Sequence, residues 1–103
     1  MFRRRRFGDL IAMQLRVFEQ DHADRLTALR ETLEAYRAAD RDDAEERYGD
    51  YADQIDWAAE ELADIRDAYA ATMEPGLVDQ YEREFGKAVR GAYPAVADAL
   101  DVL

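Results

Sequence analysis

The sequence predicts an all-α protein, and two observations carry this prediction. Apolar residues recur at steps of three and four over most of the chain, as they do on one face of an α-helix. Residues that interrupt helices are few, with two Pro and five Gly among 103 residues. We expect a long antiparallel helical hairpin followed by a shorter C-terminal helix that Gly and Pro break. The expected architecture resembles a three- to four-helix bundle completed by oligomerisation.

The first helix is expected over residues 9–39. Its inward-facing stripe stays within about 40° of one line along the helix and occupies positions 11, 15, 18, 22, 26, 29, 33 and 36. Asp9 follows Gly8 and suits the N-cap, where a carboxylate accepts hydrogen bonds from free backbone N–H groups. We therefore predict that the helix begins at this aspartate.

A turn is expected near residues 40–42, because residues 37–47 lack large apolar side chains. Asp42 and Glu45 have the spacing of a capping box, with Asp in place of Ser or Thr. The apolar residues before and after this turn nevertheless keep the spacing of one uninterrupted helix. One continuous helix of about 100 Å, at about 1.5 Å per residue, is therefore the alternative to the hairpin.

The second helix is expected over residues 43–73, where apolar side chains follow a heptad. A period of 3.5 residues favours left-handed antiparallel packing against the first helix or another chain. Pro75 and Gly76 are expected to end this helix. The predicted packing seam consists of Tyr48, Tyr51, Ile55, Leu62, Ile65 and Tyr69.

The C-terminal part is expected to form helices over residues 77–92 and 94–103, with Pro94 either kinking the chain or starting the last helix. The inward face of the first comprises Val78, Tyr81, Phe85 and Val89, and that of the second comprises Val96, Leu100 and Leu103. We expect residues 9–103 to be one helical domain.

The charge is unevenly distributed along the chain. The sequence holds 14 Lys and Arg against 24 Asp and Glu, a net charge of −10. Residues 1–8 form a basic N-terminal arm that contains Arg3, Arg4, Arg5 and Arg6, so residues 7–103 carry −14. A body this acidic repels nucleic acid and anionic membranes, which leaves the arm as the segment able to bind them. The other uses of the arm are as a free tail or as a ligand for an acidic surface of its own or a neighbouring chain.

An acidic stripe with a tryptophan is predicted on the outer side of the second helix. It consists of Asp53, Asp56, Trp57, Glu60, Asp64 and Asp67. Arg66 lies well off this line, so we expect the stripe to keep its charge. Either it is a solvated face, or it is a docking surface for a partner with a basic surface, with a cation–π contact to Trp57. A divalent-cation site shared between chains is a third interpretation.

Glu19 and His22 have the Glu-x-x-His spacing by which di-iron carboxylate bundles place two ligands on one helix face. The predicted second helix offers no inward carboxylate to complete such a site. The alternative is a core histidine that hydrogen-bonds to a tyrosine or a carboxylate.

The residue types exclude several function classes. The chain contains no Cys, no Ser and one His, which excludes disulfide scaffolds, cysteine zinc sites and Ser or Cys nucleophiles. Its glycines form no phosphate-binding loop, and no run of apolar residues spans a membrane. We expect a cytoplasmic, non-enzymatic helical protein without a cofactor that self-associates or binds a protein partner. The alternative is a ferritin-like metal-carboxylate protein, assembled from several chains, that uses Glu19 and His22 to hold iron or another divalent metal.

Overall fold

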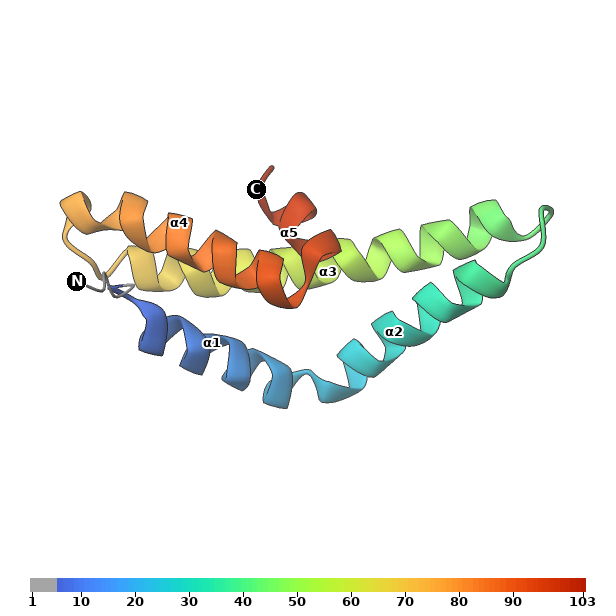
Figure 1. Cartoon of the computed structure of the whole chain (residues 1–103), viewed down its shortest axis with the longest axis horizontal. Helices are drawn as coiled ribbons and strands as arrows, with labels where there is room; N and C mark the ends of the chain where they lie inside the picture. The colour runs from blue at the N-terminus through green and yellow to red at the C-terminus, as the bar shows by residue number, and fades with distance from the viewer. Residues whose placement is uncertain (1–5) are drawn as a thin grey trace, which may run out of the picture.

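A computed structural model describes residues 6–103, and within them it confirms the all-α prediction. Its helices are α1 (Gly8–Asp21), α2 (Ala23–Ala38), α3 (Ala44–Ala70), α4 (Pro75–Ala92) and α5 (Pro94–Leu100). The longest helix, α3, packs against α2, α4 and α5, while α1 packs against α4 (Figure 1). Because α2 and α4 lie along opposite ends of α3, the molecule is elongated, with extents of 52 × 26 × 25 Å.

The predicted single helix over residues 9–39 is wrong, because the chain breaks at His22. The backbone angles of His22, φ −124° and ψ 30°, lie outside the helical range. Hydrogen bonds continue on both sides: the His22 N–H donates to the Phe18 carbonyl at 3.1 Å, and the His22 carbonyl accepts from the Leu26 N–H at 2.9 Å. Neither Pro nor Gly causes the break. It allows α1 to pack against α4 while α2 packs against α3.

The start of α1 is stabilised from a different helix, so the prediction of Asp9 as the N-cap is wrong. The helix begins at Gly8, and its N-cap Phe7 makes no side-chain capping hydrogen bond. Instead the Phe7 N–H donates to Oε1 of Glu84 in α4 at 3.0 Å. A carboxylate is favourable at this position because it lies at the positive end of the helix dipole.

Residues 39–43 form the turn between α2 and α3. The Asp43 N–H donates to Oδ1 of Asp40 at 3.1 Å and to its carbonyl at 3.2 Å. The capping box predicted from Asp42 and Glu45 is wrong, because α3 begins at Ala44 and its N-cap makes no side-chain hydrogen bond. The chain reverses here, and α2 and α3 lie side by side (Figure 1).

The C-terminal helices differ from their predicted bounds at several ends. Helix α3 ends at Ala70, three residues before the predicted end, and α4 begins at Pro75, two residues before the predicted start. Proline suits the first helical position because it has no N–H to leave unpaired there. Pro94 likewise starts α5, which ends at Leu100. The inward orientation predicted for Leu103 is wrong, since this residue is 55% exposed.

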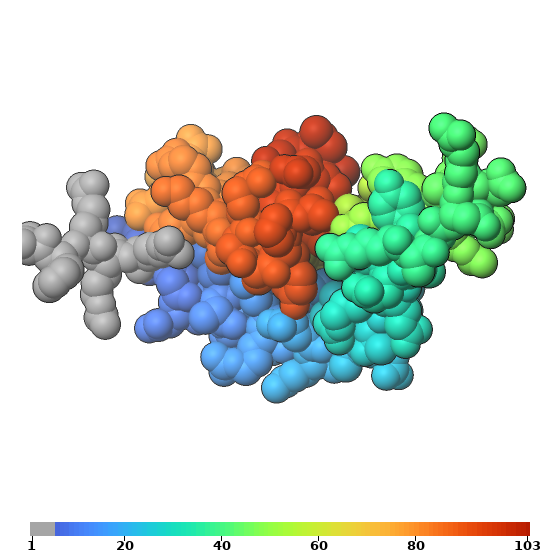
Figure 2. All heavy atoms as spheres, turned by 45° about the vertical axis from the view of Figure 1, so that its right-hand side comes forward, coloured from blue at the N-terminus to red at the C-terminus, as the bar shows by residue number. Residues whose placement is uncertain are grey.

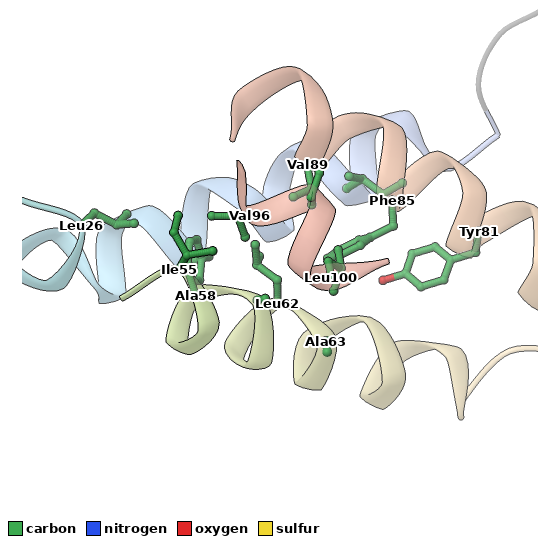
Figure 3. Packing of buried hydrophobic residues seen from close by; sticks show 14 residues of the cluster. Leu26, Ile55, Ala58, Leu62, Ala63, Tyr81, Phe85, Val89, Val96 and Leu100 are labelled. Carbon is green, nitrogen blue, oxygen red and sulfur yellow. The ribbon is translucent and has the colours of Figure 1, made fainter. Parts of the chain in front are cut away.

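The core lies where α1, α3, α4 and α5 converge. Figure 3 shows side chains of α4 and α5 directed at the α3 residues Ile55, Ala58 and Leu62. The largest fully buried side chains are Tyr81, Phe18, Phe85, Leu62, Leu100 and Val89. Two members of the predicted seam are instead exposed, Tyr48 at 54% and Tyr69 at 39%. The heptad is therefore buried in its middle and open at its ends.

The α2–α3 tip, residues 33–50, extends beyond α4 and α5 (Figures 1 and 2). Around the core, α3 contacts several helices, but at the tip α2 is its neighbour within residues 6–103. Two helices cannot cover the apolar faces of one another completely, so this end exposes aromatic side chains.

Candidate functional site

Trp57 packs within the chain rather than standing free in the acidic stripe. It is half-buried, and its ring lies 6.1 Å from Phe18 in a stacked arrangement and 5.2 Å from His22 at an angle of 79°. The guanidinium of Arg25 lies 4.1 Å from the centre of the ring. The cation–π contact that was predicted for a partner is therefore made by α2 of the same chain.

The five carboxylates of the stripe, at Asp53, Asp56, Glu60, Asp64 and Asp67, are all exposed. Arg66 donates from Nε to Oδ1 of Asp67 at 2.9 Å and also lies 3.7 Å from Oε2 of Glu82. The expectation that Arg66 leaves the stripe uncompensated is wrong at this end. The other four carboxylates make no ion pair within residues 6–103, so most of the stripe keeps its charge.

Glu19 and His22 face different partners. Nε2 of His22 lies 3.7 Å from Oε2 of Glu61 in α3. Glu19 lies beside the hydroxyl of Tyr93, where the chain passes from α4 to α5. Among the residues that the structure describes, no three His, Asp or Glu side chains are grouped as metal ligands would be. Within residues 6–103 of one chain no third ligand is grouped with Glu19 and His22, so the ferritin-like alternative requires ligands from a further chain.

The break between α1 and α2 and the break between α4 and α5 meet at one aromatic cluster. Phe18, which is 1% exposed, contacts the rings of His22 at 5.3 Å and Tyr93 at 6.4 Å. Both of these contacts are to residues at helix breaks. Sequence periodicity does not reveal this cluster, because it joins residues up to 75 positions apart in the sequence.

Tyr93 gives the cluster a dependence on alkaline pH. Burial, followed by the neighbouring Glu19 carboxylate, raises the pKa of Tyr93 to about 12 from an ordinary value of 10.0. Burial also raises the pKa of Tyr81. Because the pKa is higher in the folded state, the stabilisation is complete below about pH 10 and is lost as the pH rises towards 12.

We therefore expect the free energy of unfolding to fall between about pH 10 and pH 12, and to fall less steeply in Tyr93→Phe. Phenylalanine keeps the ring contact with Phe18 but has no proton to lose. Urea unfolding at several pH values measures the effect. Identical pH profiles for the two proteins would contradict this role of Tyr93.

The tip carries the most exposed aromatic surface in residues 6–103. Tyr36 of α2 and Tyr48 of α3 pack edge to face at 5.3 Å, and Tyr48 lies 6.5 Å from Tyr51. Tyr36 is 37% exposed and Tyr48 54% exposed. Of these two residues, Tyr48 also shares a hollow with Ala95, Asp98 and Ala99 of α5.

Two hollows adjoin these tyrosines and share Tyr51, Ile55 and Ala95 in their walls. We name the larger one, of about 380 Å³, the tyrosine groove; it is lined by Tyr48, Tyr51, Ala52, Ile55, Asp56, Ala95, Asp98 and Ala99. The smaller one, of about 170 Å³, lies between α2, α3 and the bend at Tyr93. The lining of the tyrosine groove thus combines apolar side chains with two carboxylates.

The predicted basic arm lies mostly outside the described residues, which include Arg6 but not Arg3, Arg4 or Arg5. Arg6 is exposed, and the chain is held from Phe7 onward by the Glu84 hydrogen bond and by an edge contact of Phe7 with Tyr81 at 5.5 Å. Across residues 6–103, no helix has the length and apolar character needed to span a membrane.

Comparison of the sequence with models of protein families and with curated proteins, and comparison with solved structures, gave no significant match.

Proposed function

We propose that this chain is a non-enzymatic helical protein that self-associates, and that a second copy covers the aromatic face of the α2–α3 tip. The observation that carries the proposal is the exposure of Tyr48, at 54%, beside the tyrosine groove. Exposed aromatic surface next to an apolar hollow is typical of an interface centre, where Tyr contributes strongly to binding. In this proposal α2 and α3 are an antiparallel hairpin, and a second chain completes a bundle around it.

The distribution of charge favours a second copy despite the acidity of the whole chain. Helix α2 carries three acidic and three basic residues and is balanced, whereas α3 carries nine acidic and two basic residues. Tyr48 lies five residues before Asp53, about 140° away around the helix axis. Two copies can therefore approach through α2 and the tyrosine face while most carboxylates of α3 point elsewhere.

The intramolecular use of Trp57 moves the aromatic centre of the proposed interface from Trp57 to the tyrosine groove. Arg25 already occupies the face of this ring, so a partner arginine would have to displace it. Docking of an unrelated basic protein on the stripe is the alternative, and it predicts a monomer in the absence of that protein.

Self-association is tested by sedimentation and light scattering of the full chain over a wide range of concentration. We expect the wild-type chain to form a dimer or larger oligomer. Tyr48→Ala is expected to weaken association about tenfold or more, as truncation of an interface tyrosine does. Tyr69→Ala is the matched control, because Tyr69 is 39% exposed on the same helix but lies outside the tyrosine groove.

Circular dichroism of each variant establishes that it is folded. A folded wild-type chain that stays monomeric at the highest attainable concentration would contradict the proposal. Equal weakening by Tyr69→Ala would place the interface elsewhere on α3.

A further inference from the structure

The tyrosine groove suits a ligand that is aromatic at one point and cationic beside it. Its lining combines the apolar side chains of Tyr48, Tyr51 and Ile55 with the carboxylates of Asp56 and Asp98. Ala52, Ala95 and Ala99 contribute only small side chains to the rest of its lining, and its volume is about 380 Å³. Asp98 already accepts a hydrogen bond from Arg90 at 3.0 Å, whereas Asp56 makes no ion pair within the described residues.

From this combination we infer that residues 1–6 of a second copy bind in the tyrosine groove, with Phe2 against its apolar side chains and the arginines on the carboxylates of α3. The inference rests on the proposed function, since it names the part of the second copy that covers the tip. It gives the basic arm and the uncovered groove one common role.

Charge complementarity supports this occupant. Residues 1–6 contain four arginines and no acidic residue, while the rest of the chain carries −14. Asp53 and Glu60 lie within about one helical turn of Asp56 on the same exposed side of α3. Arginine forms bidentate hydrogen bonds with carboxylates, so adjacent arginines can bind this row of side chains.

The position where the arm leaves the body favours a groove on another chain. Phe7 is held against Tyr81, and the contact of Arg66 with Glu82 places that end of α4 beside residue 66 of α3. Tyr48 precedes Arg66 in α3 by eighteen residues, so the two residues lie about 27 Å apart along the helix at 1.5 Å per residue. Six residues span at most about 21 Å when fully extended. The arm therefore falls short of the far end of its own groove, whereas a second copy can present its groove next to the arm.

Each chain offers one arm and one groove, so two chains can exchange arms around a two-fold axis. This arrangement predicts complementation between two defective variants. The arm variant replaces Phe2 with Ala and each of Arg3, Arg4, Arg5 and Arg6 with Gln. The groove variant combines Tyr48→Ala with Asp56→Asn. A mixture of the two retains one intact arm and one intact groove.

The experiment measures association of the full-length variants, alone and in an equimolar mixture, by sedimentation. We expect each variant alone to associate about tenfold more weakly than wild type, since each exposed ion pair contributes little but the pairs act together. The mixture should associate more strongly than either variant. The charge control replaces Arg16 with Glu and both Arg83 and Lys87 with Gln, all outside the α2–α3 tip, which changes the net charge by the same four units and should leave association near the wild-type level.

The outcomes separate this inference from the proposed function. Wild-type association by the arm variant, together with loss in Tyr48→Ala, would overturn the arm-in-groove contact and retain self-association. Failure of the mixture to recover association would overturn the exchange of arms, as would equal weakening by the charge control. A monomeric wild-type chain would overturn both proposals.

Discussion

Replacing Phe18 with alanine is expected to lower the free energy of unfolding by about 3–5 kcal/mol, as truncation of a buried aromatic residue does. Phe18 is 1% exposed and contacts the rings of His22, Trp57 and Tyr93. Its loss removes apolar burial and leaves a cavity where both helix breaks meet. Because small domains are stable by about 5–15 kcal/mol, this change removes a large part of the total.

Urea and thermal unfolding measure this effect. A loss of 3 kcal/mol corresponds to a decrease in Tm of more than about 10 °C for a chain of this size. The control is Val17→Ala at the neighbouring position, which is 44% exposed and should change stability by less than about 0.5 kcal/mol. A similar small change in Phe18→Ala would show that the aromatic cluster does not stabilise the junction of the helices.

The second large effect is expected at the buried pair of Tyr81 and Gln14. The Tyr81 hydroxyl donates to Oε1 of Gln14 at 3.1 Å, and the two residues are 0% and 3% exposed. Nε2 of Gln14 has no hydrogen-bond partner among residues 6–103. Tyr81→Phe would leave the whole Gln14 amide buried without a partner, at a cost of about 1–3 kcal/mol.

A double-mutant cycle separates this cost from the loss of packing. Gln14→Leu removes the unpaired amide but leaves the Tyr81 hydroxyl without its acceptor. The double variant, with Gln14→Leu and Tyr81→Phe, contains neither polar group and should be more stable than Tyr81→Phe alone. Urea unfolding of the four proteins gives the coupling energy. Additive single effects would contradict a stabilising hydrogen bond between these side chains.

Local patterns predicted the helices well wherever local chemistry decides the backbone. The three- and four-residue spacing and the rarity of Gly and Pro identified the helical class, and the prolines marked the junctions at Pro75 and Pro94. The expectation that Pro75 ends the preceding helix was wrong, because α3 has already ended at Ala70 and Pro75 begins α4. A residue that cannot donate an N–H disfavours a helix interior but suits a helix start.

Contacts between distant residues account for what sequence reasoning missed in the candidate sites. The spacing of Glu19 and His22 suggested that both side chains bind one metal ion. Instead, the bend at His22 directs its imidazole to Glu61, and Glu19 lies beside Tyr93. The helical spacing placed Trp57 among outward-facing carboxylates, which suggested a docking surface. Arg25, 32 positions earlier in the sequence, covers that ring instead.

The sequence by itself therefore determined the helical class, the acidic body with its basic arm, and the chemistries that missing residue types exclude. Helical periodicity and charge are properties of neighbouring residues, so they can be read along the chain. Only the tertiary structure decided the break at His22, the aromatic cluster around Phe18 and the exposure of Tyr48. The physical reason is that burial depends on how many helices pack at a given level. Around Leu62 several helices surround α3, whereas at Tyr48 they do not.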